Sequence, residues 1–219
     1  MARKTVSPAA AAQPAVPPKL AADRIRETAR RMFYQDGIRA VGVDALVAEA
    51  GVTKPSLYRS FSSKDELAAS YLRDYEAEFW SKFEAGGQQH PDDPRAALMV
   101  YFDGLAQRAA SSGGYRGCGL TNAAVEYPES DHPARLVAVA HKAQLRARMV
   151  ELARAMGAVD ADMLADGLLL LLEGAFVSSQ LFGRGGPARH LPEAAGRLID
   201  ASVRRRPGAK KTASAKKGA

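Results

Sequence analysis

The fold is decided by residues 33–67, which read FYQDGIRAVGVDALVAEAGVTKPSLYRSFSSKDEL. The pattern predicts two very short helices, one over residues 43–50 and one starting at Thr53. Pro55 falls in the first turn of the second helix, where a missing N–H costs nothing. Gly51 lies between the helices and supplies the left-handed backbone conformation that lets the second cross the first. Helices this short bury little apolar surface alone, so we predict a helix-turn-helix packed on flanking helices.

Helical patterns flank this stretch on both sides. Upstream, apolar residues at helical spacing predict a helix from Lys19 to Gly37. Downstream, Ser63 and Glu66 form a capping box that opens a long helix to about Phe83. No run alternates with a period of two residues, so the sequence predicts an all-α fold of about nine helices without strands. The remaining five helices are predicted over 94–110, 120–127, 132–156, 161–182 and 191–203.

Charge is distributed unevenly along the chain, whose formal net charge is +7. Residues 1–67 carry a net charge of +4, residues 68–203 of −4, and residues 204–219 of +7. This pattern is typical of a polyanion-binding module joined to a body with another role. The alternative is that the basic ends only aid solubility. The Ala/Pro-rich residues 1–18 and the basic tail 204–219 are expected to be disordered.

Several classes of function are disfavoured by the sequence. Cys118 is the single cysteine, which excludes an intrachain disulfide and a cysteine zinc cluster. The chain has no GxSxG, HExxH or P-loop motif, and its four histidines lack metal-ligand spacing. We therefore expect no enzyme activity, no metal and no cofactor. No apolar run approaches the roughly 20 residues of a membrane span, and no secretory signal is recognisable, so a cytoplasmic location is expected.

The second short helix would present short polar and basic side chains at its start, which suits base edges and phosphates in a major groove. Residues 19–70 strongly resemble the DNA-binding domain of the tetracycline-repressor (TetR) family of bacterial regulators. The predicted nine-helix layout agrees, so the resemblance extends over nearly all of residues 19–203. It implies a helix-turn-helix DNA-binding domain over 19–67 and a helical effector-binding and dimerisation domain over 68–203. Its marks are Gly37, the Ala-Gly-Val turn at 50–52, Leu57-Tyr58, Phe61 and Lys64.

The resemblance also implies which residues contact operator DNA. Residues 54–60 would form the recognition helix, and Tyr58 and Lys64 would contact phosphates. Thr53 would cap that helix and reach a phosphate as well. The predicted DNA contacts are Gly42, Thr53, Lys54, Pro55, Ser56, Tyr58, Arg59 and Lys64.

Three positions depart from the family pattern. Gly42 stands where the family usually has Thr or Ser, which leaves only the backbone N–H groups of the first short helix for an anion. Val47 replaces the usual small Ala, and Ser60 the frequent His. Tyr58 has a core-only alternative, and the basic residues have the alternative of being solvated charges. Lys54, beside a proline at a helix start, is harder to explain without an anion.

In the family, helices 5 to 7 with parts of 4 and 8 enclose a ligand pocket. The aromatic residues here would suit an aromatic or lipophilic molecule, with the plain-core interpretation as the alternative for each. Asn122 and Glu126 lie four residues apart and would either anchor a ligand or cap and solvate a helix. Cys118 would act as a redox sensor or, as we favour, as a small hydrophobe. The predicted pocket residues are Trp80, Phe83, Tyr101, Phe102, Cys118, Asn122, Glu126, His141 and Phe176.

Residues 161–182 are apolar around most of the helix circumference and must be buried on both sides. With the last helix, they predict a homodimer through residues 161–203. Small residues at 167, 174 and 175 would allow close helix approach, and Ala195, Leu198, Ile199 and Val203 would contribute from the last helix.

The function expected from the sequence is a repressor released from its double-stranded operator by a small, largely apolar ligand. The alternatives are a constitutive or activating DNA-binding protein without an effector, and a non-specific DNA-binding protein that uses its basic ends.

Overall fold

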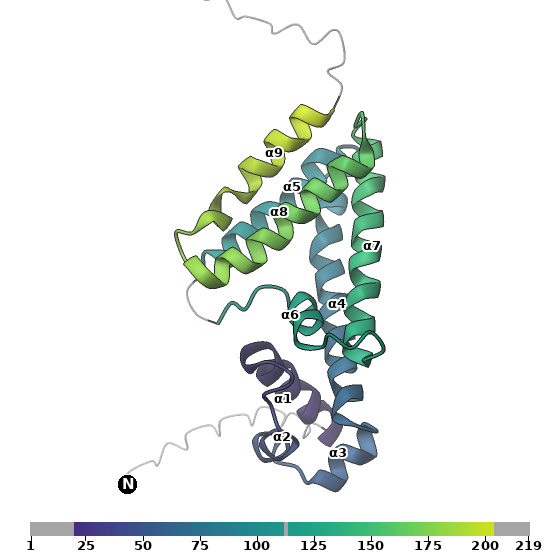
Figure 1. Ribbon diagram of the computed structural model, residues 1–219, viewed down its shortest axis with the longest axis vertical. Coiled ribbons are helices and arrows are strands. Elements are labelled where there is room, and N and C mark those ends of the chain that lie inside the picture. The colour runs from purple at the N-terminus through teal and green to yellow at the C-terminus, as the bar shows by residue number, and fades with distance from the viewer. Residues whose placement is uncertain (1–19, 112–113, 204–219) are drawn as a thin grey trace, which may run out of the picture.

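The computed structural model describes residues 20–111 and 114–203, and its regular elements there are α-helices with one short 3₁₀ helix (Figure 1). The predicted disordered arm, residues 1–18, and the basic tail, residues 204–219, lie outside the described residues. The elements are α1 Ala21–Asp36, α2 Val43–Ala50, α3 Lys54–Ser60, α4 Lys64–Gln89, α5 Pro94–Ala109, α6 Gly119–Glu126, α7 Pro133–Ala155, α8 Ala161–Phe182, η1 Pro187–His190 and α9 Leu191–Ser202.

Local chemistry explains the three-helix unit at the N-terminal end. Gly51 adopts φ 62° and ψ 41°, the left-handed conformation predicted for the turn between α2 and α3. Thr53 caps α3, since its Oγ1 accepts from the Ser56 N–H at 3.4 Å. Leu46 and Leu57 are almost completely buried and join α2 and α3 to the core. The predicted helix-turn-helix is therefore confirmed.

Helix α4 is longer than predicted and joins the N-terminal unit to the rest of the chain (Figure 1). The predicted end near Phe83 is wrong, because α4 continues to Gln89. Gly86 is buried where α4 crosses α5, and a Cβ at Gly86 would lie 1.9 Å from the Ala97 carbonyl oxygen. This glycine allows a close crossing and does not end the helix. The predicted division between residues 67 and 68 falls inside α4.

Only half of the predicted capping box forms at the start of α4. The Ser63 Oγ accepts from the Glu66 N–H at 3.0 Å. The Glu66 carboxylate accepts from Arg73 at 2.7 Å, and no bond from it to the Ser63 N–H forms.

The C-terminal body packs around α4. α4 contacts α5 and α7, α7 contacts α8, and α9 lies on α5 and α8. One hydrophobic cluster runs from α1 to α9, so the N-terminal unit and the body share a core. None of the helices in the described ranges combines the length and apolarity that crossing a membrane requires.

Candidate nucleic-acid interface and ligand cleft

The outer face of α3 presents most of the predicted DNA contacts. Tyr58 is 51% exposed, so a core-only role does not fit it. Leu57 and Phe61 are buried and hold the helix against the core. Thr53, Lys54, Pro55 and Arg59 are also exposed, and Ser56 is half-buried.

Hydrogen bonds organise this face before any DNA is bound. The Ser56 Oγ lies 3.0 Å from the Thr53 Oγ1 and accepts from the Arg59 guanidinium at 2.8 Å. Ser60 donates to the Ser56 carbonyl at 3.2 Å. Holding these side chains in place reduces the entropy lost when a ligand binds them.

Asp44 supplies the anion that Lys54 needs at the start of α3. The Lys54 Nζ lies 2.7 Å from the Asp44 carboxylate, and this hydrogen bond raises the pKa of Lys54. Asp44 is not among the residues predicted from the sequence, although it lies in the first turn of α2 and only ten residues before Lys54. The position of Lys54 therefore does not require an external anion.

Lys64 and Gly42 lie at helix starts beside α3. Lys64 is half-buried, and its Nζ donates to the Arg39 carbonyl at 3.4 Å. Burial lowers the pKa of Lys64 from its ordinary value. Gly42 precedes α2 without a side-chain cap, and a Cβ there would meet nothing within 4 Å. The space for the family's usual hydroxyl residue is present, and only its side chain is missing.

Arg39, which is not among the residues predicted from the sequence, links the N-terminal unit to the body. Its backbone N–H donates to Glu126 at 2.8 Å, and its guanidinium donates to Glu129 at 2.9 Å. The guanidinium also lies 5.0 Å from the centroid of the Tyr127 ring. Because these partners lie 87 to 90 positions away, no local pattern indicates them.

A second link joins the end of α1 to the loop before α6. The Tyr34 hydroxyl donates to the Gly117 carbonyl at 3.1 Å and accepts from the Arg116 N–H at 2.9 Å. Gln35 donates to the Gly114 carbonyl at 2.8 Å. The C-terminal end of α1 is thus held by residues 114–117.

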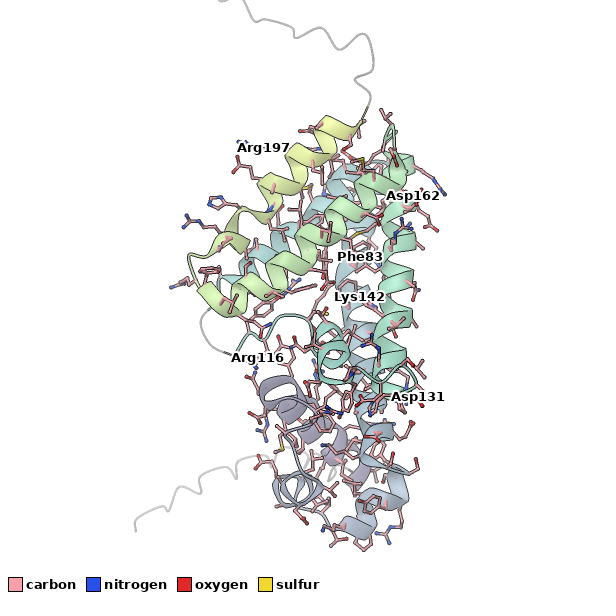
Figure 2. The ribbon with its side chains drawn as sticks, viewed as in Figure 1. Phe83, Arg116, Asp131, Lys142, Asp162 and Arg197 are labelled. Carbon is pink, nitrogen blue, oxygen red and sulfur yellow. The ribbon has the colours of Figure 1, made fainter. Side chains whose placement is uncertain are left out.

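The predicted pocket residues do not gather around one cavity. Phe83 lies inside the body (Figure 2). Phe79 stacks on Phe83 at 5.9 Å and meets the buried His141 edge-on at 4.5 Å between centroids. Trp80 packs on Phe83 at 5.6 Å and lines a separate hollow of about 410 Å³. The rings of these residues pack on one another between the helices, as in the plain-core alternative, and their predicted role in ligand binding stays a prediction.

The other predicted pocket residues already have roles within the chain. Asn122 donates to the Arg116 carbonyl at 2.7 Å, and Glu126 binds the Arg39 N–H. Phe102 and Cys118 are buried in the core. Burial of Cys118 fits the small-hydrophobe interpretation, although the Lys142 Nζ lies 3.6 Å from its sulfur.

His141 is a core residue with one partner. Its Nδ1 lies 3.3 Å from the Glu76 carboxylate, whereas its Nε2 is buried without a hydrogen-bond partner in the described chain. Burial, and to a smaller degree the charge of Lys142, lowers the pKa of His141 to about 4. The imidazole is therefore neutral at pH 7.

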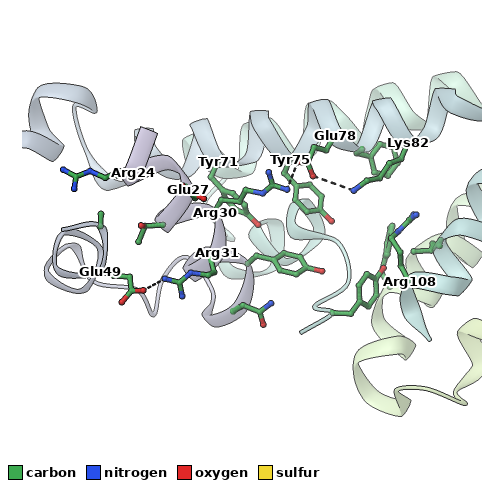
Figure 3. A pocket seen from close by; sticks show the side chains of 18 of the residues that line it. Arg24, Glu27, Arg30, Arg31, Glu49, Tyr71, Tyr75, Glu78, Lys82 and Arg108 are labelled. Carbon is green, nitrogen blue, oxygen red and sulfur yellow. Dashed lines mark hydrogen bonds and ion pairs between the residues drawn. The ribbon is translucent and has the colours of Figure 1, made fainter. Parts of the chain in front are cut away.

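A cavity of about 770 Å³ lies instead between α1 and the body (Figure 3). Of the predicted pocket residues, Tyr101 and Phe176 line it. The rest of the wall comes from charged residues of α1 and α2 and from side chains of α4, α5 and the loop before α6. We call this cavity the interface cleft. Its other lining residues are Arg24, Glu27, Thr28, Arg30, Arg31, Tyr34, Gln35, Glu49, Ala50, Tyr71, Tyr75, Glu78, Phe79, Lys82, Leu105, Arg108 and Tyr115.

Comparison with known proteins identifies the family. Residues 25–71 match the family described as bacterial regulatory proteins, tetR family. A crystal structure of a putative TetR transcriptional regulator from Streptomyces avermitilis is 32% identical, covers 84% of this chain and 98% of that chain, and superposes with a TM-score of 0.76.

Two curated regulators match over shorter segments. The HTH-type transcriptional repressor ComR of Escherichia coli is 30% identical over 46% of this chain and 48% of its own length. The HTH-type transcriptional activator FasR of Mycolicibacterium smegmatis is 34% identical over 40% of each chain. This chain thus spans less than half the length of these two curated relatives. From the structural match over nearly a whole relative and the helix-turn-helix geometry, we conclude that the chain is a DNA-binding transcriptional regulator, not an enzyme, and belongs to the TetR family of bacterial regulatory proteins.

Proposed function

We propose that this protein is a dimeric repressor whose affinity for its operator falls when a small molecule binds in the interface cleft. The observation that carries the proposal is the position of the cleft, which is lined by α1 of the helix-turn-helix unit and by α4, α5 and α8 of the body. A molecule that fills such a cleft contacts both parts at once. Any preference for one relative position of the two parts becomes a difference in DNA affinity.

The contacts between the two parts support this coupling. The end of α1 is tied to residues 114–117 through Tyr34 and Gln35, and Arg39 is tied to α6 through Glu126. Tyr115 belongs to the same loop and lines the interface cleft. A ligand that displaces Tyr115 would therefore act on the residues that hold α1.

An exposed stripe on α8 supports dimerisation. Met163, Leu170, Val177 and Leu181 are 49% to 74% exposed and follow one another at helical spacing. Gly174 lies on the same face, and a Cβ there would meet nothing within 4 Å. A contiguous apolar face of this kind is typical of an interface between subunits.

The role of α9 in the dimer is narrower than the sequence predicts. Ala195 and Ile199, expected to contribute to the interface, are buried inside the protomer, where α9 packs on α5 and α8. The outer surface of α9 is polar, with Arg197 donating to Glu193 at 2.6 Å (Figure 2). We therefore centre the proposed interface on α8.

Repression is the simpler outcome of DNA binding, because a dimer that overlaps a promoter blocks it without any further contact. The proposed DNA contacts remain those of α3 and its neighbours, including Tyr58, Lys64 and the N-terminus of α2. Two recognition helices in a two-fold dimer read half-sites one helical turn apart or a multiple of it.

The test begins with an operator selected by the protein from random DNA. Compounds that raise the melting temperature of the protein are then titrated with and without that operator. Linkage requires that a ligand weakening operator binding by a given factor is itself bound more weakly on DNA by the same factor. We expect roughly 5- to 150-fold effects for a gating ligand. Equal affinities for every stabilising compound would favour the constitutive alternative.

A further inference from the structure

Three tyrosine hydroxyls in the interface cleft have no partner in the described chain. Tyr71 and Tyr101 are each 3% exposed, and Tyr115 is half-buried. All three line the cavity, and none of their hydroxyls hydrogen-bonds to a described residue. By contrast, the hydroxyls of Tyr34 and Tyr75 both donate to the Gly117 carbonyl. None of the three hydroxyls is a fully buried unpartnered atom, so they open into the cleft and are available as donors to a molecule bound there.

The unpaired charge in the same cleft is positive. Of the three carboxylates that line the cleft, Glu78 pairs with Arg30 at 2.5 Å and with Lys82 at 3.7 Å, Glu49 pairs with Arg31, and Glu27 also has an interaction partner. Arg108 of α5 is half-buried and forms no ion pair with any described carboxylate. Its guanidinium carbon lies 5.7 Å from the centroid of the Tyr101 ring.

The interface cleft has a positively charged side chain at one end and aromatic side chains in its middle. Arg108 lies at the end of the interface cleft away from Arg24 and Glu49, with tyrosines of α4 between (Figure 3). Burial raises the pKa of Tyr71, Tyr101 and Tyr115 well above the ordinary value. The phenols therefore remain neutral hydrogen-bond donors at pH 7. The charge of Arg108 acts on Tyr101 and Tyr115, and two phenol donors near a guanidinium that has no ion pair with a described carboxylate favour an anionic acceptor.

We propose that the interface cleft binds an aromatic carboxylate. The carboxylate pairs with the Arg108 guanidinium, which offers two parallel N–H donors. The ring lies against Phe79 and the tyrosine rings, and the free hydroxyls donate to the acid or to a substituent on its ring. A volume of about 770 Å³ accommodates a molecule of two or three rings. The regulatory consequence rests on the proposed function, whereas the binding chemistry rests on the cleft alone.

The test uses 2-naphthoate as the probe and 2-naphthalenemethanol as its neutral counterpart. Calorimetric titration of the full-length protein at pH 7.5 should give at least tenfold tighter binding of the acid, since a charge-assisted hydrogen bond contributes more than a neutral one. Arg108→Met should weaken the acid to the level of the alcohol. Arg197→Met removes an equal charge on α9, outside the interface cleft, where the guanidinium pairs with Glu193 at 2.6 Å, and should change the affinity less than about threefold.

Tyr101→Phe provides an independent readout. It removes a hydroxyl that supports no contact in the described chain, so the melting temperature should stay unchanged while the affinity for 2-naphthoate falls severalfold. If Arg108→Met fails to fold, Arg108→Lys keeps the charge but loses the paired donors, and should still weaken binding.

Three results would overturn the inference: no binding of 2-naphthoate at millimolar concentration, equal binding of acid and alcohol, or full affinity in both Arg108 variants. Operator affinity is measured separately in the presence of the probe. If 2-naphthoate binds through Arg108 but leaves operator affinity unchanged, the site stands and the gating function fails.

Discussion

The helix-turn-helix unit and the body place their functional groups in opposite ways. In α3, seven residues suffice, Arg59 and Ser60 are held by Ser56 three or four positions away, and Lys54 is held by Asp44 ten positions away. In the body, the cleft is lined by residues of α1, α2, α4, α5, α8 and the loop before α6. DNA contact is thus a local property of one helix surface, whereas small-molecule binding depends on how distant elements pack. A local site is preorganised, and a distributed site is able to transmit movement.

The largest expected effect tests whether the local DNA-reading unit works only in pairs. Leu170→Glu puts a charge in the middle of the exposed α8 stripe, where Leu170 is 73% exposed, and a buried unpaired charge disrupts an interface strongly. Sedimentation should then change from twice the 23.3 kDa chain mass to one chain mass. Operator affinity should fall roughly 100-fold, because two linked half-site contacts become one.

Leu136→Glu is the matched control, since Leu136 is 54% exposed on α7 and off the stripe. This variant should remain dimeric. A wild-type protein that sediments as a monomer at micromolar concentration would refute the proposed interface.

The next effect concerns α4, the element that the two regions share. Gly86→Ala would place a Cβ 1.9 Å from the Ala97 carbonyl oxygen, so α4 and α5 must move apart. We expect a loss of about 1–3 kcal/mol in the free energy of unfolding, measured by urea denaturation. Gly87→Ala meets only the Glu84 carboxylate at 3.9 Å and should stabilise α4 by up to about 1 kcal/mol. Equal effects of the two variants would contradict the close crossing.

These contrasts explain what the sequence predicts well and what it does not. The bounds of α2 and the turn at Gly51 follow from local signals that neighbouring residues carry. The length of α4 does not follow from local signals. In the sequence, a glycine such as Gly86 is typical of a helix end, whereas in the structure it allows close contact with Ala97 of α5. The interface cleft was missed for the same reason, since its walls come from segments far apart in the sequence. Trp80 and Phe83 were predicted to line a ligand pocket, with plain core as the alternative, and their rings pack on each other and on Phe79.

A loss of stability at low pH is expected from His141, which is buried in the body. The pKa of His141 is about 4 in the folded chain, against an ordinary value of 6.5. Below pH 6.5 the unfolded chain binds a proton that the folded chain does not, so stability should fall as the pH drops from 6.5 towards 4. In His141→Gln this dependence should be weaker when urea midpoints at pH 7 and pH 5 are compared. His190→Gln, on the exposed η1, should keep the wild-type dependence.

A smaller effect is expected at the start of α4. Lys64→Ala should weaken binding to all DNA sequences alike and reduce the salt slope by about one unit, as loss of one phosphate contact requires. Fluorescence anisotropy with selected and scrambled DNA at several salt concentrations measures both quantities. If affinity and slope are unchanged, Lys64 serves only to hold the Arg39 carbonyl.

The smallest effect tests the ion pair that occupies Lys54 before DNA arrives. Asp44 is 83% exposed and holds the Lys54 ammonium at 2.7 Å. Asp44→Asn removes a negative charge from the proposed DNA face and frees Lys54 for a phosphate. We expect affinity for all DNA to rise about two- to fivefold, in keeping with the modest energy of an exposed ion pair, with a steeper salt slope. Asp103→Asn, an equal charge change at an exposed site on α5, should have no effect. A loss of affinity for the selected operator alone would mean that Asp44 positions Lys54 for a base, because repulsion from phosphates acts on every sequence equally.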